Sequence, residues 1–135
     1  MAKISFDGLQ KYAKEINALG GSVDKAAKYA VYPAAGYVRD QIKAATPVDE
    51  GDLRDSVSLE KFTVGEDEVY TKIFFDGYDR NHVPNALKAN AIESGTSRMK
   101  KRPFIRPTVN RTKAEAQRIM SEKLDEYFDN LMGGK

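Results

Sequence analysis

The sequence contains no cysteine and only one histidine among its 135 residues. The lack of cysteine excludes disulfide bonds, thiolate metal ligands and a cysteine nucleophile, and it is compatible with a reducing compartment. The single histidine, His82, lies in a polar stretch without the partners that a catalytic triad or a metal site needs. Since a glycine-rich phosphate-binding loop is also missing, we expect no enzyme activity, no cofactor and no small-molecule substrate.

Long apolar runs and a strong charge imbalance are missing as well. No apolar run approaches the ~20 residues that span a membrane, and the N-terminus lacks the apolar core of a secretion signal. The net charge is only +2, so any affinity for nucleic acid would have to come from local clustering of basic residues. The length and the 41% hydrophobic residues indicate one globular domain in three parts, namely a helical part (1–45), a loop and sheet part (46–97), and a basic arm with a C-terminal helix (98–135).

The N-terminal part carries two helical patterns. Apolar residues at helical spacing predict a first helix over residues 6–19, with Ser5 as its cap. An alanine-rich stripe predicts a longer second helix over residues 23–45, capped by Ser22. Pro33 predicts a kink or a break in it, because an interior proline removes a hydrogen bond and costs ~3 kcal/mol. For three tyrosines around this bend we favour packing at the core boundary over a subunit interface: Tyr29, Tyr32 and Tyr37.

An acidic cluster follows the second helix. Its members surround Gly51 and are Asp49, Glu50, Asp52 and Asp55. As a calcium loop the pattern fails, because Arg54 takes the position that requires glycine and Leu53 takes a ligand position. We therefore expect no metal, and we interpret the segment as a turn at Gly51 that Leu53 anchors to the core. Arg54 is expected to form an exposed ion pair with a neighbouring acid.

The middle of the chain predicts two strands, over residues 57–64 and 69–75, joined by a hairpin turn. A lone two-stranded hairpin is marginally stable, so this one must pack on a helix or join the sheet of a neighbouring subunit. Residues 76–84 are typical of a loop. For residues 85–93 a short helix and a third strand both remain open, with helix favoured in the first half. A long amphipathic helix is predicted over residues 108–131, with Thr112 and Glu115 as a possible capping box if the helix starts later.

The most unusual stretch is the basic arm that follows Glu93. It has no acid before Glu115 and carries five basic residues between 93 and 107. Gly95 allows a sharp turn, and the residues before the two prolines are pushed towards extended conformations. We interpret the stretch as a stiff docking arm, and a plain solvated loop is equally open. The candidate interface residues are Arg98, Lys100, Lys101, Arg102, Pro103, Phe104, Ile105, Arg106 and Pro107, and the candidate structural turn residues are Gly51, Leu53, Gly95 and Thr96.

Three segments in order resemble the HK97 gp10-type tail-component family of tailed bacteriophages. Residues 46–56 contain the pattern Pro-x-Asp-x-Gly-x-Leu-Arg-x-Ser, residues 93–96 contain Glu-x-Gly-Thr, and residues 102–107 contain Arg-Pro-Phe-x-x-Pro. The resemblance spans residues 45–111. Ser94 departs from it, because the family often has an aromatic or bulky apolar residue at that position.

The resemblance implies a structural virion protein that acts in head–tail joining or tail completion, after assembly in the host cytoplasm. It implies a homo-oligomeric ring that docks on neighbouring neck or tail proteins, with the basic arm on an acidic surface and Phe104, exposed on the free arm, as the anchor that docking buries. The alternative is a nucleic-acid-binding module that uses residues 98–113, with non-specific contact to genome DNA in the channel. The expected fold is α+β, with N-terminal helices, a small antiparallel β-sheet, a basic proline-containing arm and a long C-terminal helix.

Overall fold

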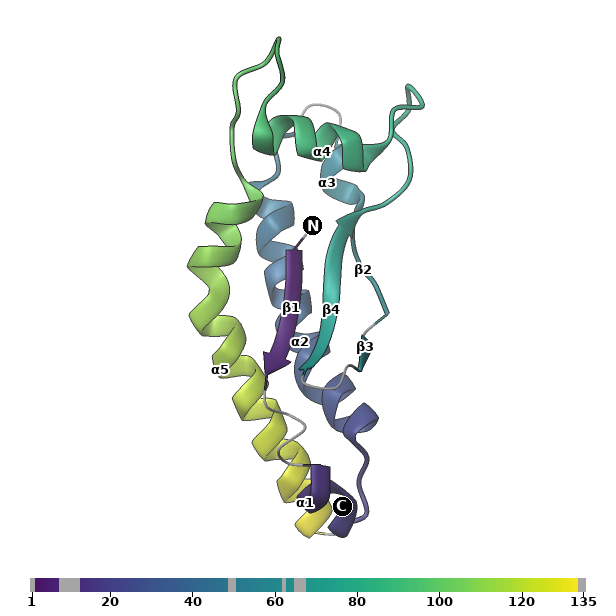
Figure 1. Cartoon of the computed structure of the whole chain (residues 1–135), viewed down its shortest axis with the longest axis vertical. Coiled ribbons are helices and arrows are strands. Elements are labelled where there is room, and N and C mark those ends of the chain that lie inside the picture. Colours follow the sequence, from purple (N-terminus) through teal and green to yellow (C-terminus); the bar gives the residue numbers. More distant parts are fainter. Residues whose placement is uncertain (1, 8–12, 49–50, 62, 65–67, 134–135) are drawn as a thin grey trace.

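The fold is built around helix α2 (Val23–Ala45), which packs against both a β-sheet and the long C-terminal helix α5 (Ile105–Met132) (Figure 1). A computed structural model describes residues 2–7, 13–48, 51–61, 63–64 and 68–133. The two helices run antiparallel, because Ser22 contacts Tyr127 whereas Gln41 lies beside Arg111. The expected α+β fold with a long C-terminal helix is confirmed.

Helix α2 is buried on two sides. The Ser22 side chain accepts a hydrogen bond from the Lys25 N–H at 3.1 Å, as its predicted capping role requires. Its fully buried alanines let α5 and the sheet approach closely and are Ala26, Ala27, Ala30, Ala34 and Ala35. Of the kink or break expected at Pro33, the break is wrong, since the helix continues through this residue, and the kink stays a prediction. Pro33 is exposed, so its ring displaces no core side chain, and packing of the helix outweighs the lost hydrogen bond.

Strand β4 (Glu68–Phe75) lies in the centre of an antiparallel sheet, with β1 (Ala2–Asp7) on one side and β2 (Val57–Leu59) and β3 (Thr63–Val64) on the other. The helix expected over residues 6–19 is therefore wrong at its start. Only α1 (Ala13–Ala18) is helical, and residues 8–12 lie outside the described part of the chain. The alternation of apolar and polar residues in β1, together with its backbone hydrogen bonds to β4, outweighs the helical spacing that begins at Phe6. Strand β1 also gives the sheet the further strand that a two-stranded hairpin lacks.

The second predicted strand, β4, is confirmed, and Thr71, Ile73 and Phe75 turn to the buried side. The first predicted strand is divided into β2 and β3. Val57 pairs with Phe75, whereas Thr63 pairs with Tyr70, so the register shifts by one residue between the two pieces. Such a shift is typical of a β-bulge.

The end of the molecule at the top of Figure 1 is formed by residues 47–48, the turn at Gly51 with α3 (Asp52–Asp55), the loop 76–84, α4 (Asn85–Ser94) and the loop 95–103, and we call it the head. We call α2, α5 and the sheet the body. Residues 85–94 are helical throughout, so the third-strand alternative is wrong. Helix α5 begins at Ile105 rather than later, so Thr112 lies inside it and is no capping residue. Within the described residues, no helix is long and apolar enough to cross a membrane.

Candidate protein-binding site at the head

The carboxylate of Glu93 holds the start of α5 against the end of α4. It accepts hydrogen bonds from the backbone N–H groups of Phe104 at 2.7 Å, Ile105 at 2.8 Å and Arg106 at 2.9 Å. The first N–H groups of a helix have no intrahelical acceptor, so this distant side chain caps α5. Partial burial raises the pKa of Glu93, but the three N–H donors outweigh it and lower the pKa below the usual value.

The loop 95–103 is closed by its own hydrogen bonds. Gly95 has a φ of 78°, the positive value expected at a turn. The Thr96 N–H donates to the Met99 carbonyl at 2.8 Å, and the Thr96 hydroxyl accepts from the N–H groups of Arg98 and Met99 at 3.1 and 3.0 Å. The Arg102 N–H donates to the Ile92 carbonyl at 2.7 Å. With the Glu93 carboxylate at its far end, the loop is fixed on both sides.

The expectation that Phe104 is exposed is wrong. Its side chain is 6% exposed and packs edge-on against Phe75, with ring centroids 5.9 Å apart and an interplanar angle of 74°. Ile105 is also buried, because the first turn of α5 packs on the body. Arg106 is helical rather than extended. Pro107 is the third residue of α5, where a proline lacks no intrahelical hydrogen bond.

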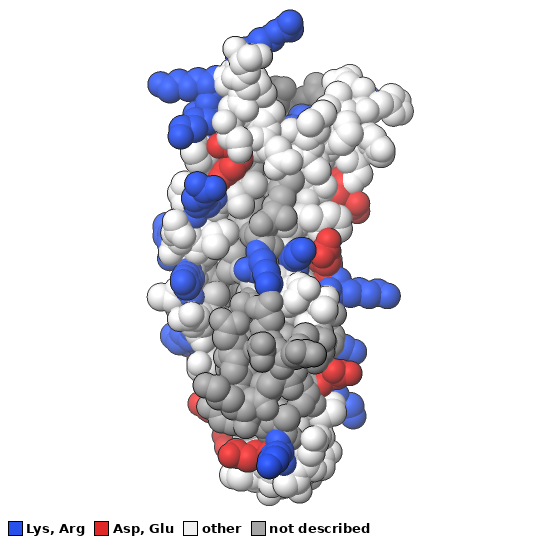
Figure 2. Space-filling model, viewed as in Figure 1, with Lys and Arg blue, Asp and Glu red and all other residues white. Residues whose placement is uncertain are grey.

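The loop 95–103 exposes four basic side chains to solvent. Arg98, Lys100, Lys101 and Arg102 are exposed, and none forms an ion pair with an acid in the described part of the chain. Pro103 is exposed beside them. Figure 2 shows Lys and Arg side chains projecting from the head and continuing down the α5 side. The exposed basic residues on the first half of α5, before Glu115, are Arg106, Arg111 and Lys113.

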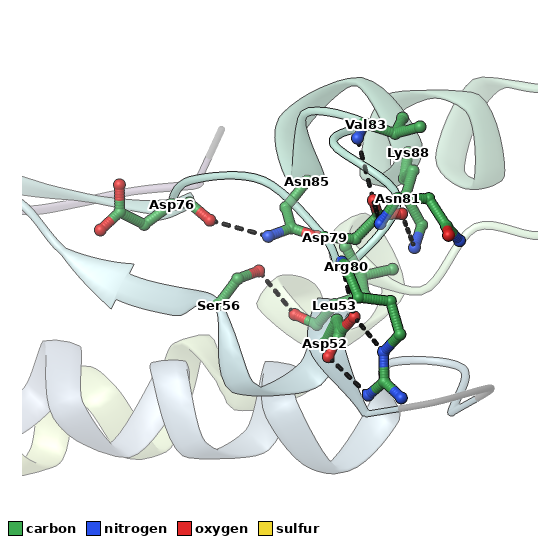
Figure 3. A network of polar contacts seen from close by, with 10 residues as sticks. All are labelled: Asp52, Leu53, Ser56, Asp76, Asp79, Arg80, Asn81, Val83, Asn85 and Lys88. Carbon is green, nitrogen blue, oxygen red and sulfur yellow. Dashed lines mark hydrogen bonds and ion pairs between the residues drawn. The ribbon is translucent and has the colours of Figure 1, made fainter.

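Asp52 connects α3 to the loop 76–84 (Figure 3). Its two carboxylate oxygens accept from the Arg80 guanidinium at 2.9 Å each, and the Arg80 N–H adds a third bond at 3.0 Å. These bonds, the side-chain ones foremost, hold the pKa of Asp52 far below its usual range. Sequence analysis missed this pair, because Asp52 and Arg80 are 28 positions apart.

Asp79, a buried residue of the loop 76–84, also fixes the conformation of this loop. Its side chain is only 5% exposed and accepts from Lys88 Nζ at 2.9 Å, and from the N–H groups of Asn81 and Val83 at 2.8 and 2.9 Å. The Lys88 bond comes first among the causes that lower the pKa of Asp79. Loop 76–84 is thus fixed by side chains that bind its backbone, as Figure 3 shows.

The acidic cluster around Gly51 therefore has a structural role where it is described. Gly51 has a φ of 87° and Leu53 is 5% exposed, so the turn and the apolar anchor are both present. Arg54 forms the expected exposed ion pair, with Asp55 at 3.0 Å. Asp49 and Glu50 lie outside the described residues. In the described part of the chain, no group of three or more His, Asp or Glu residues is placed to hold a metal ion.

Apolar side chains gather at the head as well. Four of the six large apolar residues exposed in the described part lie there, namely Val48, Tyr78, Val83 and Leu87. An open groove of about 470 Å³ separates the α3 turn from α4 and the loop 95–103. Its lining includes Val48, Leu53, Ile92 and Met99, with Lys88 and Arg102. Exposed apolar side chains beside exposed arginines are typical of protein interfaces.

A family model with the description "Bacteriophage HK97-gp10, putative tail-component" matches residues 10–101. The match includes the Gly51 turn and the Glu93–Gly95 corner, and it ends inside the loop 95–103. The Arg-Pro-Phe segment and α5 therefore lie beyond it. No curated protein and no solved structure matches the chain.

Proposed function

The chain belongs to the HK97 gp10-like family of bacteriophage tail components, and we propose that it is a structural virion protein that acts in head–tail joining or tail completion. Its work is assembly rather than catalysis. Copies made in the host cytoplasm form a homo-oligomeric ring in the virion, and the head of each copy docks on an acidic surface of a neighbouring neck or tail protein.

The observation that carries this proposal is a set of exposed cations on a loop that is fixed at both ends, none of them in an ion pair with an acid of the described residues. A fixed loop loses little conformational entropy when it docks, so more of the contact energy remains as affinity. Charge complementarity to an acidic partner would speed the encounter and set its orientation. The exposed apolar side chains at the same end supply the surface that a protein partner would bury.

The elongated shape of the subunit supports a ring. The head lies at one end in Figure 1, so contacts along the flanks of the body would leave the heads of all copies facing the same way. A contact between two different flanks is heterologous, and such contacts close into rings when the rotation between neighbours permits.

Electron microscopy of lysates from the parent phage with this gene deleted tests the proposal. We expect DNA-filled heads beside unattached tails, and rescue by the wild-type gene. The variant Lys101→Glu/Arg102→Glu should fail to rescue, because its loop repels an acidic partner. The control Lys14→Glu/Lys25→Glu reverses as many exposed charges at the opposite end and should rescue. Complete infectious particles without the gene would contradict the proposal.

The second candidate is nucleic-acid binding by the same residues. Seven basic side chains between 98 and 113 are exposed, and residues 94–114 contain no acid. Contacts to phosphates would release counterions, so DNA retention in a gel-shift assay should fall steeply as salt rises. We rank this function second, because phosphate contacts give no role to the exposed apolar residues of the head. Salt-sensitive DNA retention that Lys101→Glu/Arg102→Glu abolishes, together with intact particles in the deletion lysate, would reverse the order.

A further inference from the structure

We infer that the groove at the head is the binding site for one segment of the partner, an acidic segment with an apolar side chain between carboxylates. The inference rests on the proposed docking function and replaces Phe104, which is buried, as the place of the apolar anchor. The groove lies between two parts of the chain: residues 47–48 and 51–53 line one side, and residues between 88 and 102 line the other. Its volume of about 470 Å³ falls in the range of roughly 300–1,000 Å³ that is usual for ligand sites.

The apolar part of the site is formed by a closed floor and an open rim. Leu53 is 5% exposed and forms the floor, and the half-buried Ile92 and Met99 form the walls. Val48 on the rim is 59% exposed. An inserted aliphatic side chain would cover these surfaces and gain about 25 cal/mol for each Å² of apolar surface removed from water. The groove can therefore take up an apolar side chain of the partner. Phe104 cannot serve as the apolar anchor of the contact, because it is buried in the core.

The charge of the site selects an acidic segment. Asp52 in the lining is already neutralised by Arg80, and Lys88 is engaged by Asp79. Arg102 remains without an ion-pair partner in the described part of the chain. Exposed cations on the adjoining loop 95–103 extend the positive field, and they are Arg98, Lys100 and Lys101. Carboxylates that flank the anchor would meet these cations at the groove rim.

Fixed walls make the site suitable for a short segment. The Thr96 and Arg102 hydrogen bonds fix the loop wall, and Asp52 holds α3 to the loop 76–84. Gly95 lets the two arms of the loop lie close together, because a Cβ there would lie 2.9 Å from the Lys101 nitrogen. A duplex DNA backbone would meet the cations but would leave Val48 and Met99 in water. The combined features therefore favour a protein segment over nucleic acid.

A peptide titration followed by NMR tests the inference directly. The probe is an acetylated peptide Asp-Glu-Leu-Glu-Asp, compared with the same peptide carrying serine for leucine and with a short DNA duplex. We expect shifts at Val48, Ile92 and Met99 with the leucine peptide, and binding at least about tenfold weaker with the serine peptide. Equal affinity for both peptides, no binding of either, or groove shifts with DNA alone would overturn the inference.

Variants at two exposed aliphatic residues of the head sharpen the test. Val48→Asp places a like charge on the groove rim and should weaken the leucine peptide at least about tenfold. Leu87→Asp makes the same kind of change outside the groove, at a residue 61% exposed, and should leave the affinity within about twofold. Equal effects of the two variants would mean that only the general charge of the head matters, which contradicts the inference.

Complementation of the deleted phage separates this inference from the proposed function. We expect Val48→Asp to fail and Met132→Asp, a control 68% exposed at the opposite end, to restore particles. If Val48→Asp restores particles while Lys101→Glu/Arg102→Glu fails, the groove is not the docking site and the docking function stands. If both head variants restore particles, the docking function fails as well.

Discussion

The body is held together by apolar packing, whereas the head is held by charged side chains that bind backbone groups. Along α2 the alanines facing the sheet and α5 are fully buried, and Ile42, Ile73 and Met120 belong to the same core. In the head, the carboxylates of Asp52, Asp79 and Glu93 each accept two or more backbone or side-chain hydrogen bonds.

The difference follows from what each region must expose. A docking surface has to stay in contact with water until its partner arrives, so the apolar side chains that it keeps exposed for the partner cannot be the ones that fix it. Directional hydrogen bonds to backbone N–H groups fix the geometry of a loop and leave its outer side chains free. Apolar packing lacks this directionality but supplies most of the folding free energy. Substitutions in the two regions should therefore have different consequences.

The largest effect is expected where the two regions meet, at Phe104. The Phe104→Ala substitution should lower the free energy of unfolding by about 3–5 kcal/mol, because it removes a buried ring from the core and leaves a cavity. Urea unfolding followed by circular dichroism measures this loss. A loss below about 1 kcal/mol would show that the ring does not pack on Phe75, and it would restore Phe104 as a candidate surface anchor.

Gly95→Ala tests the backbone of the head. Gly95 combines φ of 78° with ψ of 171°, a conformation available almost only to glycine, and an added Cβ would also crowd the Lys101 backbone. We expect a loss of about 1–3 kcal/mol and NMR shifts along the loop 95–103. Gly77→Ala is the matched control, since its φ is 65° and its Cβ would meet nothing within 4 Å. The control should lower the unfolding free energy by about 1 kcal/mol, from backbone strain alone. Equal NMR shifts along the loop 95–103 from both variants would contradict the close approach of Gly95 to the Lys101 backbone.

Glu93→Gln tests the clamp on α5. The glutamine amide keeps the shape of the carboxylate, but only its oxygen can accept hydrogen bonds, and its NH2 group would face the backbone N–H donors at the start of α5. The free energy of unfolding should therefore fall by about 1–2 kcal/mol at neutral pH. The pKa of Glu93 is lower in the fold than its ordinary value, so its stabilisation is fully present above that ordinary value and is lost as pH falls through the folded value. Urea unfolding from neutral to acidic pH should show the two proteins converging in acid. If the difference in unfolding free energy between the two proteins stays constant with pH, the ionised Glu93 carboxylate is not its cause.

Local patterns in the sequence were enough to predict α2 and β4 in the body. Helix α2 follows from the spacing of Ala27, Ala30 and Ala34 behind the Ser22 cap, and β4 follows from the alternation of apolar residues up to Phe75. Both signals lie within one element. Strand β1 was missed because Phe6 also begins a helical spacing with Leu9, and because its partner strand lies more than sixty positions away.

The head was predictable only in part for a related reason. The turns at Gly51 and Gly95 are marked by their residue types, but Glu93 caps residues 11 to 13 positions further along the chain. Nothing near Ile105 signals this cap. Without it α5 was expected to begin later, and Phe104 was placed on an exposed arm instead of in the core. The direction of one aromatic side chain thus depended on where a helix begins, which a distant carboxylate determines.

The smallest effect on stability is expected for the exposed cations of the loop. Lys101→Glu/Arg102→Glu should change the unfolding free energy by less than about 0.5 kcal/mol per substitution, because neither side chain packs in the core or forms an ion pair with an acid in the described residues. Urea unfolding beside the Lys14→Glu/Lys25→Glu control measures this. Unchanged stability together with failed particle assembly would separate docking from folding, because a folded subunit would then lack only its surface charge. A loss similar to that of Phe104→Ala would instead mean that these cations hold the head in place, and assembly failure of the same variant would then reflect misfolding.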